Sequence, residues 1–250
     1  MQKYLSSKIF ITIGIVLTFA VNMLAIILPL NNISTAAVSD SFKVYFVPAN
    51  YVFSIWSVIY VALIAFMVYQ WLLKDKEYKV VNKMMPMILL GSAANSIWLI
   101  TWHYGQFYWG LLLMVLLLLS LLVIYITIST AKRSELPKKA SLLIKFPFSI
   151  YLGWITVATV ANVTNVLWLT GWDGFGLTGP MWSAIMIVVA GALAMLMLIR
   201  QKDFAYAAVI IWAIVGIAQK FYHENQIVLT VSLVVFAIVL TALSKLVKNK

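Results

Sequence analysis

The sequence predicts an all-α, polytopic integral membrane protein with about eight transmembrane helices. Apolar residues make up 64% of the 250-residue chain, and charged residues make up only 10%. Soluble proteins average about 45–50% apolar and about 25% charged residues. Long stretches, such as the one between Lys83 and Lys132, contain no charged residue at all. Because a transmembrane helix needs about 20 apolar residues, this composition excludes an ordinary soluble domain.

The uncharged stretches divide into eight expected helices. The stretch between Lys83 and Lys132 is long enough for two of them, and His103–Gln106 separates the pair. The first helix is too long for a signal peptide and lacks a small-residue cleavage site. The seventh is the shortest. The expected ranges are 9–30, 51–73, 84–102, 108–128, 148–170, 181–199, 204–220 and 227–246.

The basic residues predict the orientation of these helices. Only Lys43 and Lys220, of the 18 lysines and arginines, fall on one side of the expected membrane. The positive-inside rule therefore places both termini in the cytoplasm. The chain carries no organelle signal, so we expect a bacterial plasma membrane. The net charge of +11 is then a topology signal, and we expect no nucleic-acid partner. The other side receives Lys3, Lys8, Lys74, Lys76, Lys79, Lys83, Lys132, Arg133, Lys138, Lys139, Lys145, Arg200, Lys202, Lys245, Lys248 and Lys250.

Few residues in this chain are suited to catalysis, metal binding or ion coupling. It has no cysteine, two histidines and seven carboxylates, so we expect no metal site. No ionisable residue lies in the body of an expected helix, which disfavours proton- or ion-coupled transport. We find no nucleophile–base pair or phosphate-binding loop, identify no catalytic residue, and favour a protein that is not an enzyme. The glycine-rich run 171–179 is expected to form a turn, with a lid as the alternative.

Aromatic residues and asparagines form three stripes at helical spacing within the expected spans. A buried asparagine amide must bond a neighbouring helix or a ligand, so the stripes indicate either helix packing or a pocket for a large planar ligand. Six of the ten tryptophans lie at helix ends and fit the interfacial belt: Trp71, Trp102, Trp109, Trp168, Trp172 and Trp182. The stripes are Phe53, Trp56 and Tyr60; then Asn95, Trp98 and Trp102; then Tyr151, Trp154, Ala158, Asn162 and Asn165.

At these same stripes the sequence resembles the TspO/MBR family (translocator protein, tryptophan-rich sensory protein). The segment from Pro48 to Tyr60 resembles the family's second-helix signature. Asn95–Trp98, followed by Trp102 and Gly105, resembles its third-helix pattern, and Tyr151–Asn162 resembles its fifth. The resemblance covers about residues 5–170, so three C-terminal helices are additional to the minimal five-helix fold.

The resemblance implies a five-helix ligand-binding bundle over residues 1–170 and three additional helices over 171–250. The implied ligand is a porphyrin, haem or another planar hydrophobic molecule, and no cofactor is required. The implied partners are the lipid bilayer and this ligand, and a homodimer stays open. The expected ligand-binding residues are Tyr51, Phe53, Trp56, Tyr60, Asn95, Trp98, Trp102, Tyr151, Trp154, Ala158 and Asn162.

Three functions remain open for such a protein. The pocket chemistry and the resemblance favour a membrane receptor or sensor. A passive or exchange transporter of small hydrophobic or tetrapyrrole molecules is the first alternative, with the three additional helices forming part of its path. A porphyrin-degrading enzyme is the second alternative, since some bacterial members of the TspO/MBR family, which this sequence resembles, are reported to degrade porphyrins.

Overall fold

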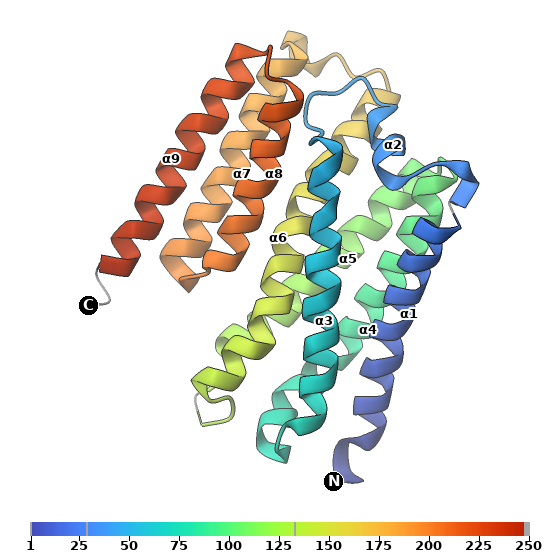
Figure 1. The fold of residues 1–250 in the computed structure, drawn as a ribbon, viewed down its shortest axis with the longest axis vertical. Coiled ribbons are helices and arrows are strands. Elements are labelled where there is room, and N and C mark those ends of the chain that lie inside the picture. The colour runs from blue at the N-terminus through green and yellow to red at the C-terminus, as the bar shows by residue number, and fades with distance from the viewer. Residues whose placement is uncertain (1, 29, 133, 248–250) are drawn as a thin grey trace. The chain divides into compact units, whose positions relative to one another are not determined.

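Apolar helices make up nearly all of the structure, a computed structural model that describes residues 2–28, 30–132 and 134–247. Arg133, Lys248 and Lys250, which contributed to the orientation argument, lie outside these residues. The described residues contain no strand. The α-helices among them are α1 (Leu5–Ile27), α2 (Thr35–Asp40), α3 (Ile55–Leu72), α4 (Asp75–His103), α5 (Phe107–Thr130), α6 (Lys138–Leu169), α7 (Gly179–Gln201), α8 (Phe204–Lys220) and α9 (Asn225–Val247) (Figure 1).

The predicted all-helical membrane fold is confirmed. In the described part of the chain, seven helices are long and apolar enough to cross a membrane. The remaining expected helix, the seventh along the chain, is α8, a shorter apolar helix of 17 residues. At 1.5 Å per residue it spans about 26 Å, somewhat less than the roughly 30 Å hydrocarbon core. The helix α2 has six residues and belongs to the connection between the first two long helices.

Two helices begin about two or more turns earlier than expected. The helix α4 starts at Asp75 and α6 at Lys138, whereas the sequence suggested starts near 84 and 148. Apolar stretches mark only the membrane part of a helix, while lysine and glutamate are good helix formers outside it. At the start of α4, the Glu77 carboxylate accepts a hydrogen bond from the Lys74 backbone N–H at 3.2 Å. This bond satisfies one of the donors left free by the first turn.

The chain forms two compact units. Unit 1 comprises Met1–Thr35 and Ile55–Leu152, and unit 2 comprises Ala36–Ser54 and Gly153–Lys250. The division at residue 170 that the resemblance implies concerns ligand binding, and it stays a prediction.

In unit 1, the helix α4 packs against α1 and α5, and α1 also packs against α3. A buried amide pair links α1 to α4: Asn22 Nδ2 donates to Asn95 Oδ1 at 2.8 Å. At the lysine-rich end of the unit, the buried Tyr78 hydroxyl donates to Ser7 Oγ at 3.2 Å. Polar contacts therefore hold α1 to α4 near both ends of their shared interface.

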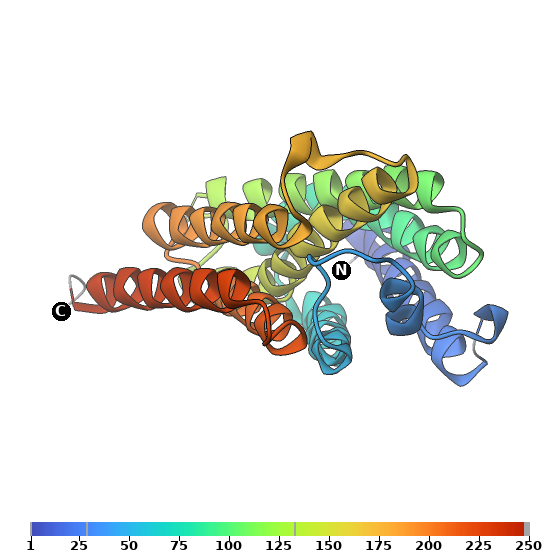
Figure 2. The same ribbon diagram turned by 90° about the horizontal axis from the view of Figure 1, so that it is seen from above.

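In unit 2, the helices α7, α8 and α9 pack on one another (Figure 2). The part of α6 that belongs to this unit contacts α8, where the Tyr206 hydroxyl donates to Thr156 Oγ1 at 3.1 Å. The turn η3 (Asn50–Ser54) also packs against α8. The later part of the connection between the first two long helices, Ala36–Ser54, therefore belongs to unit 2.

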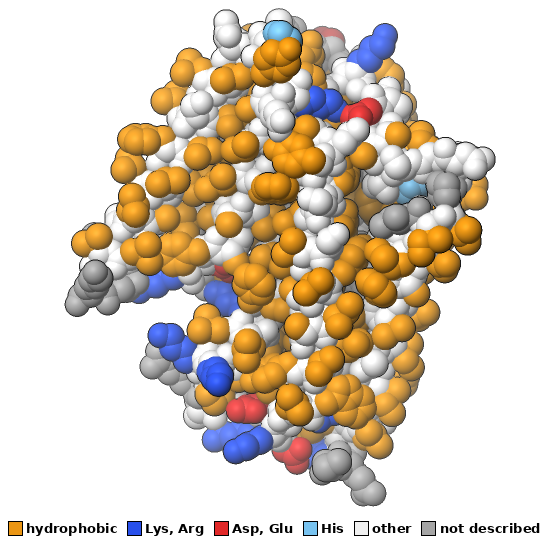
Figure 3. Space-filling model, viewed as in Figure 1, with side chains coloured by type: hydrophobic (Ala, Val, Ile, Leu, Met, Phe, Trp, Pro, Cys, Tyr) orange, Lys and Arg blue, Asp and Glu red, His pale blue; other side chains and the backbone are white. Residues whose placement is uncertain are grey.

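The helices expose large apolar side chains along their length. Examples are Val61 on α3, which is 69% exposed, and Leu229 on α9, which is 62% exposed. In Figure 3, hydrophobic side chains cover most of the visible face, and charged side chains gather towards the helix ends. An apolar surface of this extent requires lipid rather than water as its solvent. The protein is therefore an integral membrane protein.

Candidate functional site

The structure distributes the predicted ligand-binding residues between the two units. Unit 1 holds Trp56, Tyr60, Asn95, Trp98, Trp102 and Tyr151, and unit 2 holds Tyr51, Phe53, Trp154, Ala158 and Asn162.

In unit 1, the rings of Phe19, Trp56, Tyr60 and Tyr151 form what we call the Trp56 cluster. Trp56 stacks on Tyr60, one helical turn away on α3, with ring centroids 5.5 Å apart and planes at 18°. Tyr151 of α6 meets Trp56 edge-on at 5.8 Å, and Phe19 of α1 meets Tyr60 edge-on at 5.9 Å. Sequence reasoning missed Phe19, because no aromatic stripe on its own helix marked it.

Three buried polar atoms in this region have no hydrogen-bond partner among the described residues: Tyr60 Oη, Tyr151 Oη and Asn95 Nδ2. Asn95 is fully buried, and its Oδ1 is already bonded to Asn22. Its side chain lies next to the Tyr151 hydroxyl. Buried polar groups in native proteins nearly always have partners, and a bilayer offers no water as a substitute. The Trp56 cluster and its neighbour Asn95 therefore hold two hydroxyls and one amide nitrogen that can each donate a hydrogen bond to a further group.

Side chains fill most of the space beside the Trp56 cluster. A cavity lined by Tyr151, Thr18 and Leu117 measures about 20 Å³. That volume accommodates about one water molecule. A planar ligand therefore fits this region only if one or more rings of the cluster turn aside.

The remaining pair of unit 1 anchors the connection that follows α1. Trp98 and Trp102 stack at 5.6 Å, and Trp102 Nε1 donates to the Thr35 carbonyl oxygen at 3.2 Å. The buried His103, the last residue of α4, has its Nε2 3.3 Å from Thr35 Oγ1. Asn31 Nδ2 donates to the His103 carbonyl oxygen at 3.0 Å. The third-helix stripe therefore has a structural role at the end of α4.

The second-helix stripe departs from its expected geometry. Tyr51 and Phe53 lie in the 3₁₀ turn η3, and the α-helix that carries Trp56 and Tyr60 begins only at Ile55. Phe53 therefore precedes the α-helix that carries Trp56 and Tyr60, and the expectation that the three share one helical face stays a prediction.

In unit 2, Phe53 meets the buried Trp154 edge-on at 5.8 Å. Tyr51 meets Trp212 edge-on at 5.2 Å. On the same part of α6, Asn162 Nδ2 donates to the Ala158 carbonyl oxygen at 2.8 Å. The fifth-helix stripe therefore packs against η3 through Trp154, and the Asn162 amide nitrogen has a hydrogen-bond partner within α6.

Sequence reasoning missed a cavity of about 500 Å³ in unit 2. It is lined by the segment 43–46, by α6, by the connection after α6 and by α7. Trp168, Trp172 and Trp182 contribute to its walls, although their positions at helix ends suggested only a membrane-interface belt. The signal that could have found it is the close spacing of these three tryptophans around the glycine-rich run.

A comparison with protein-family models identifies the chain. The model described as TSPO-like protein matches residues 8–244. The chain belongs to the TSPO-like protein family. The TSPO-like match is wider than the expected resemblance over residues 5–170, because it includes α7, α8 and most of α9. Neither the curated proteins nor the solved structures that were compared contain a match to this TSPO-like chain.

Proposed function

We propose that this TSPO-like protein is a membrane receptor or sensor that binds a porphyrin or another planar hydrophobic ligand at the Trp56 cluster. The observation that carries the proposal is the group of unsatisfied polar atoms beside stacked rings, at Tyr60, Tyr151 and Asn95. Flat aromatic walls with a few convergent polar groups are typical of sites for planar ligands.

The unsatisfied groups specify the ligand further. A tyrosine hydroxyl and an amide nitrogen each donate a proton, so Tyr60, Tyr151 and Asn95 supply donors. A matching ligand offers acceptors, such as carboxylate or carbonyl oxygens, on a flat apolar body. Trp56 supplies the ring face on which that body stacks once the Trp56–Tyr60 stack opens. On the resemblance, Trp154, Ala158 and Asn162 remain proposed contacts as well.

The first test removes the hydroxyls and keeps the rings. Protoporphyrin is titrated into the protein in lipid nanodiscs, and the shift of its absorbance band reports binding. The double variant Tyr60→Phe/Tyr151→Phe should bind about tenfold more weakly, because each hydrogen bond contributes about 0.5–1.5 kcal/mol. The matched control is Tyr108→Phe on α5, whose side chain is 61% exposed. Equal affinities of wild type and double variant would reject the site.

A second test separates a receptor from a transporter. Protoporphyrin is added outside sealed proteoliposomes that contain a trapped porphyrin-binding protein, and the signal of the internal complex is followed. A receptor leaves the rate at the value of protein-free vesicles. An accelerated rate that the double variant abolishes would instead support passive transport through this site.

A further inference from the structure

We propose that the 500 Å³ cavity of unit 2 is a second binding site, which takes a small planar aromatic anion. It shares no residue with the Trp56 cluster. The volume lies within the range of about 300–1,000 Å³ that is typical of small-molecule sites. It has room for a body of two or three fused rings.

One wall of the cavity is aromatic and fixed in place without a ligand. The rings of Trp172 and Trp182 lie 4.9 Å apart with planes at 52°. Trp182 Nε1 donates to the Gly174 carbonyl oxygen at 2.6 Å, which sets the orientation of its ring. Gly174 has a φ of +67°, and a Cβ there would lie 2.8 Å from Trp182 Nε1. The loop geometry and the ring position therefore depend on each other.

Another wall is the segment 43–46, which is fastened to α7. Ser183 Oγ donates to the Tyr45 carbonyl oxygen at 3.0 Å. The Tyr45 ring lies against Gly179, where a Cβ would approach it to 2.5 Å. This close approach is available only because residue 179 is glycine.

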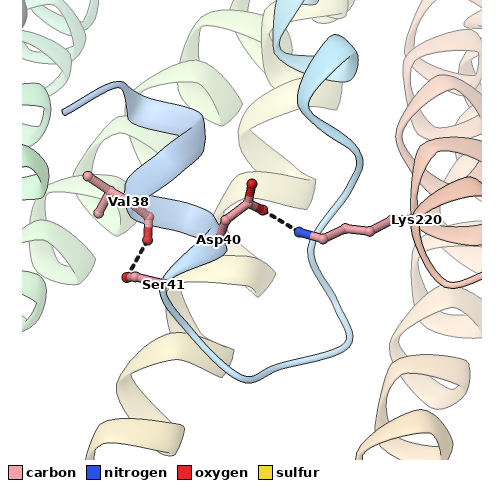
Figure 4. A network of polar contacts seen from close by, with 4 residues as sticks. All are labelled: Val38, Asp40, Ser41 and Lys220. Atoms are coloured by element: carbon pink, nitrogen blue, oxygen red, sulfur yellow. Dashed lines mark hydrogen bonds and ion pairs between the residues drawn. The ribbon is translucent and has the colours of Figure 1, made fainter.

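The connection that precedes this wall is held by an ion pair. Asp40 Oδ1 accepts from Lys220 Nζ of α8, and beside it Ser41 Oγ donates to the Val38 carbonyl oxygen at 2.7 Å (Figure 4). The backbone of the segment is therefore anchored on both sides of the cavity residues. A site that is formed before binding does not lose affinity to the ordering of its walls.

The polar groups of the cavity select the charge of the ligand. The hydroxyls of Thr159, Thr164 and Ser183 already donate to backbone carbonyl oxygens. The Asp173 carboxylate accepts from the Phe175 backbone N–H at 3.0 Å. Lys43 lines the same cavity and has no ion pair or hydrogen bond among the described residues. Asp173 keeps its negative charge, so the cavity is lined by one acidic and one basic side chain. The exposed Lys43 ammonium is the group that a ligand with one anionic group on an aromatic body complements.

The experiment uses 2-naphthoate and its neutral isostere 2-naphthamide. Binding to the protein in zwitterionic nanodiscs is measured by equilibrium dialysis against empty nanodiscs. Naphthoate should bind saturably and about tenfold more tightly than naphthamide, as expected for one charge-assisted hydrogen bond. Lys43→Met should reduce naphthoate affinity to that of naphthamide and leave naphthamide binding unchanged. Trp172→Leu should weaken both compounds.

The controls distinguish this site from the Trp56 cluster and from nonspecific binding. Lys76→Met at the start of α4 and Trp109→Leu on α5, which is 62% exposed, should not change naphthoate binding. Tyr60→Phe/Tyr151→Phe should also leave it unchanged, so the two proposals can fail separately. The proposal is overturned if naphthoate and naphthamide bind alike, or if Lys43→Met has no effect. Displacement of naphthoate by phosphatidylglycerol in the nanodisc would also overturn it, because the site would then hold a lipid headgroup.

Discussion

The two units of the molecule solve the same packing problem in different ways. In unit 1, aromatic rings from neighbouring helices fill the space between those helices, and the adjacent cavity measures only about 20 Å³. Three buried polar atoms there have no hydrogen-bond partner among the described residues. In unit 2, two connecting segments close around the ends of helices and leave about 500 Å³ between walls whose hydroxyls are paired. Elsewhere in this unit, the buried amide of Asn165 has no hydrogen-bond partner among the described residues. Helix faces can interdigitate side chain by side chain, whereas a loop held at a few points cannot fill every gap. The two proposed sites therefore differ: binding at the Trp56 cluster requires its rings to turn aside, whereas the volume in unit 2 is open without such a change.

The largest expected effect comes from a substitution that disturbs the packing of η3 on α8, next to the segment that lines the cavity of unit 2. A Cβ at Gly216 would lie 2.1 Å from Val52 Cγ2, and the Gly216 carbonyl oxygen accepts from the Ala49 backbone N–H at 3.1 Å. Gly216→Ala should lower the free energy of unfolding by about 2 kcal/mol through overpacking. It should also raise hydrogen exchange in the segment 43–52.

The control for this change is Gly110→Ala in unit 1. A Cβ there has its nearest neighbour, Thr101 Oγ1, at an ordinary 3.6 Å. Its unfolding midpoint and its exchange pattern should match the wild type. If both variants behave alike, close packing of η3 on α8 does not hold the segment in place.

The second prediction tests whether unit 1 binds by ring stacking. Trp56→Leu removes the indole ring on which Tyr60 stacks and on which we expect a planar ligand to stack. Protoporphyrin binding should weaken by about 1.5 kcal/mol, which is roughly tenfold. Naphthoate binding in unit 2 should be unchanged. Loss of both activities in a well-folded variant would mean that the two sites are not independent.

The third prediction concerns the interior amide pair of unit 1. Asn22→Ala leaves Asn95 Oδ1 without its donor at 2.8 Å. The expected loss of stability is about 1 kcal/mol, since interhelical hydrogen bonds in membranes contribute modestly. Denaturation in mixed micelles measures it. Asn95→Ala should cost no more than this, because it removes an unsatisfied amide nitrogen as well as the bond.

The smallest expected effect is at the ion pair of unit 2. Asp40 and Lys220 have side-chain exposures of 35% and 25%, so solvent screens their attraction. Asp40→Asn should cost less than about 1 kcal/mol, and high salt should reduce that cost further. A double-mutant cycle with Lys220→Met isolates the pair. A coupling that does not respond to salt would indicate that these side chains act through packing.

The long helices could be predicted from the sequence, because the bilayer requires about 20 apolar residues in each span. The stacking of Trp56 on Tyr60 also followed from their four-residue spacing. The early starts of α4 and α6 could not be predicted in the same way, since apolar stretches report the membrane and not the helix. The apolar spans and the Trp56–Tyr60 pair could be predicted because they are local: each depends on residues that are neighbours along the chain.

Contacts between distant segments were decided by tertiary structure alone. Nothing near Phe53 in the sequence shows that α3 begins at Ile55 or that the Phe53 ring meets Trp154. Trp172 and Trp182 have the same positions at helix ends as belt tryptophans, yet they pack on each other and line a cavity. Hydropathy and helical period describe one helix at a time, while a cavity depends on which connecting segment packs against which helix end.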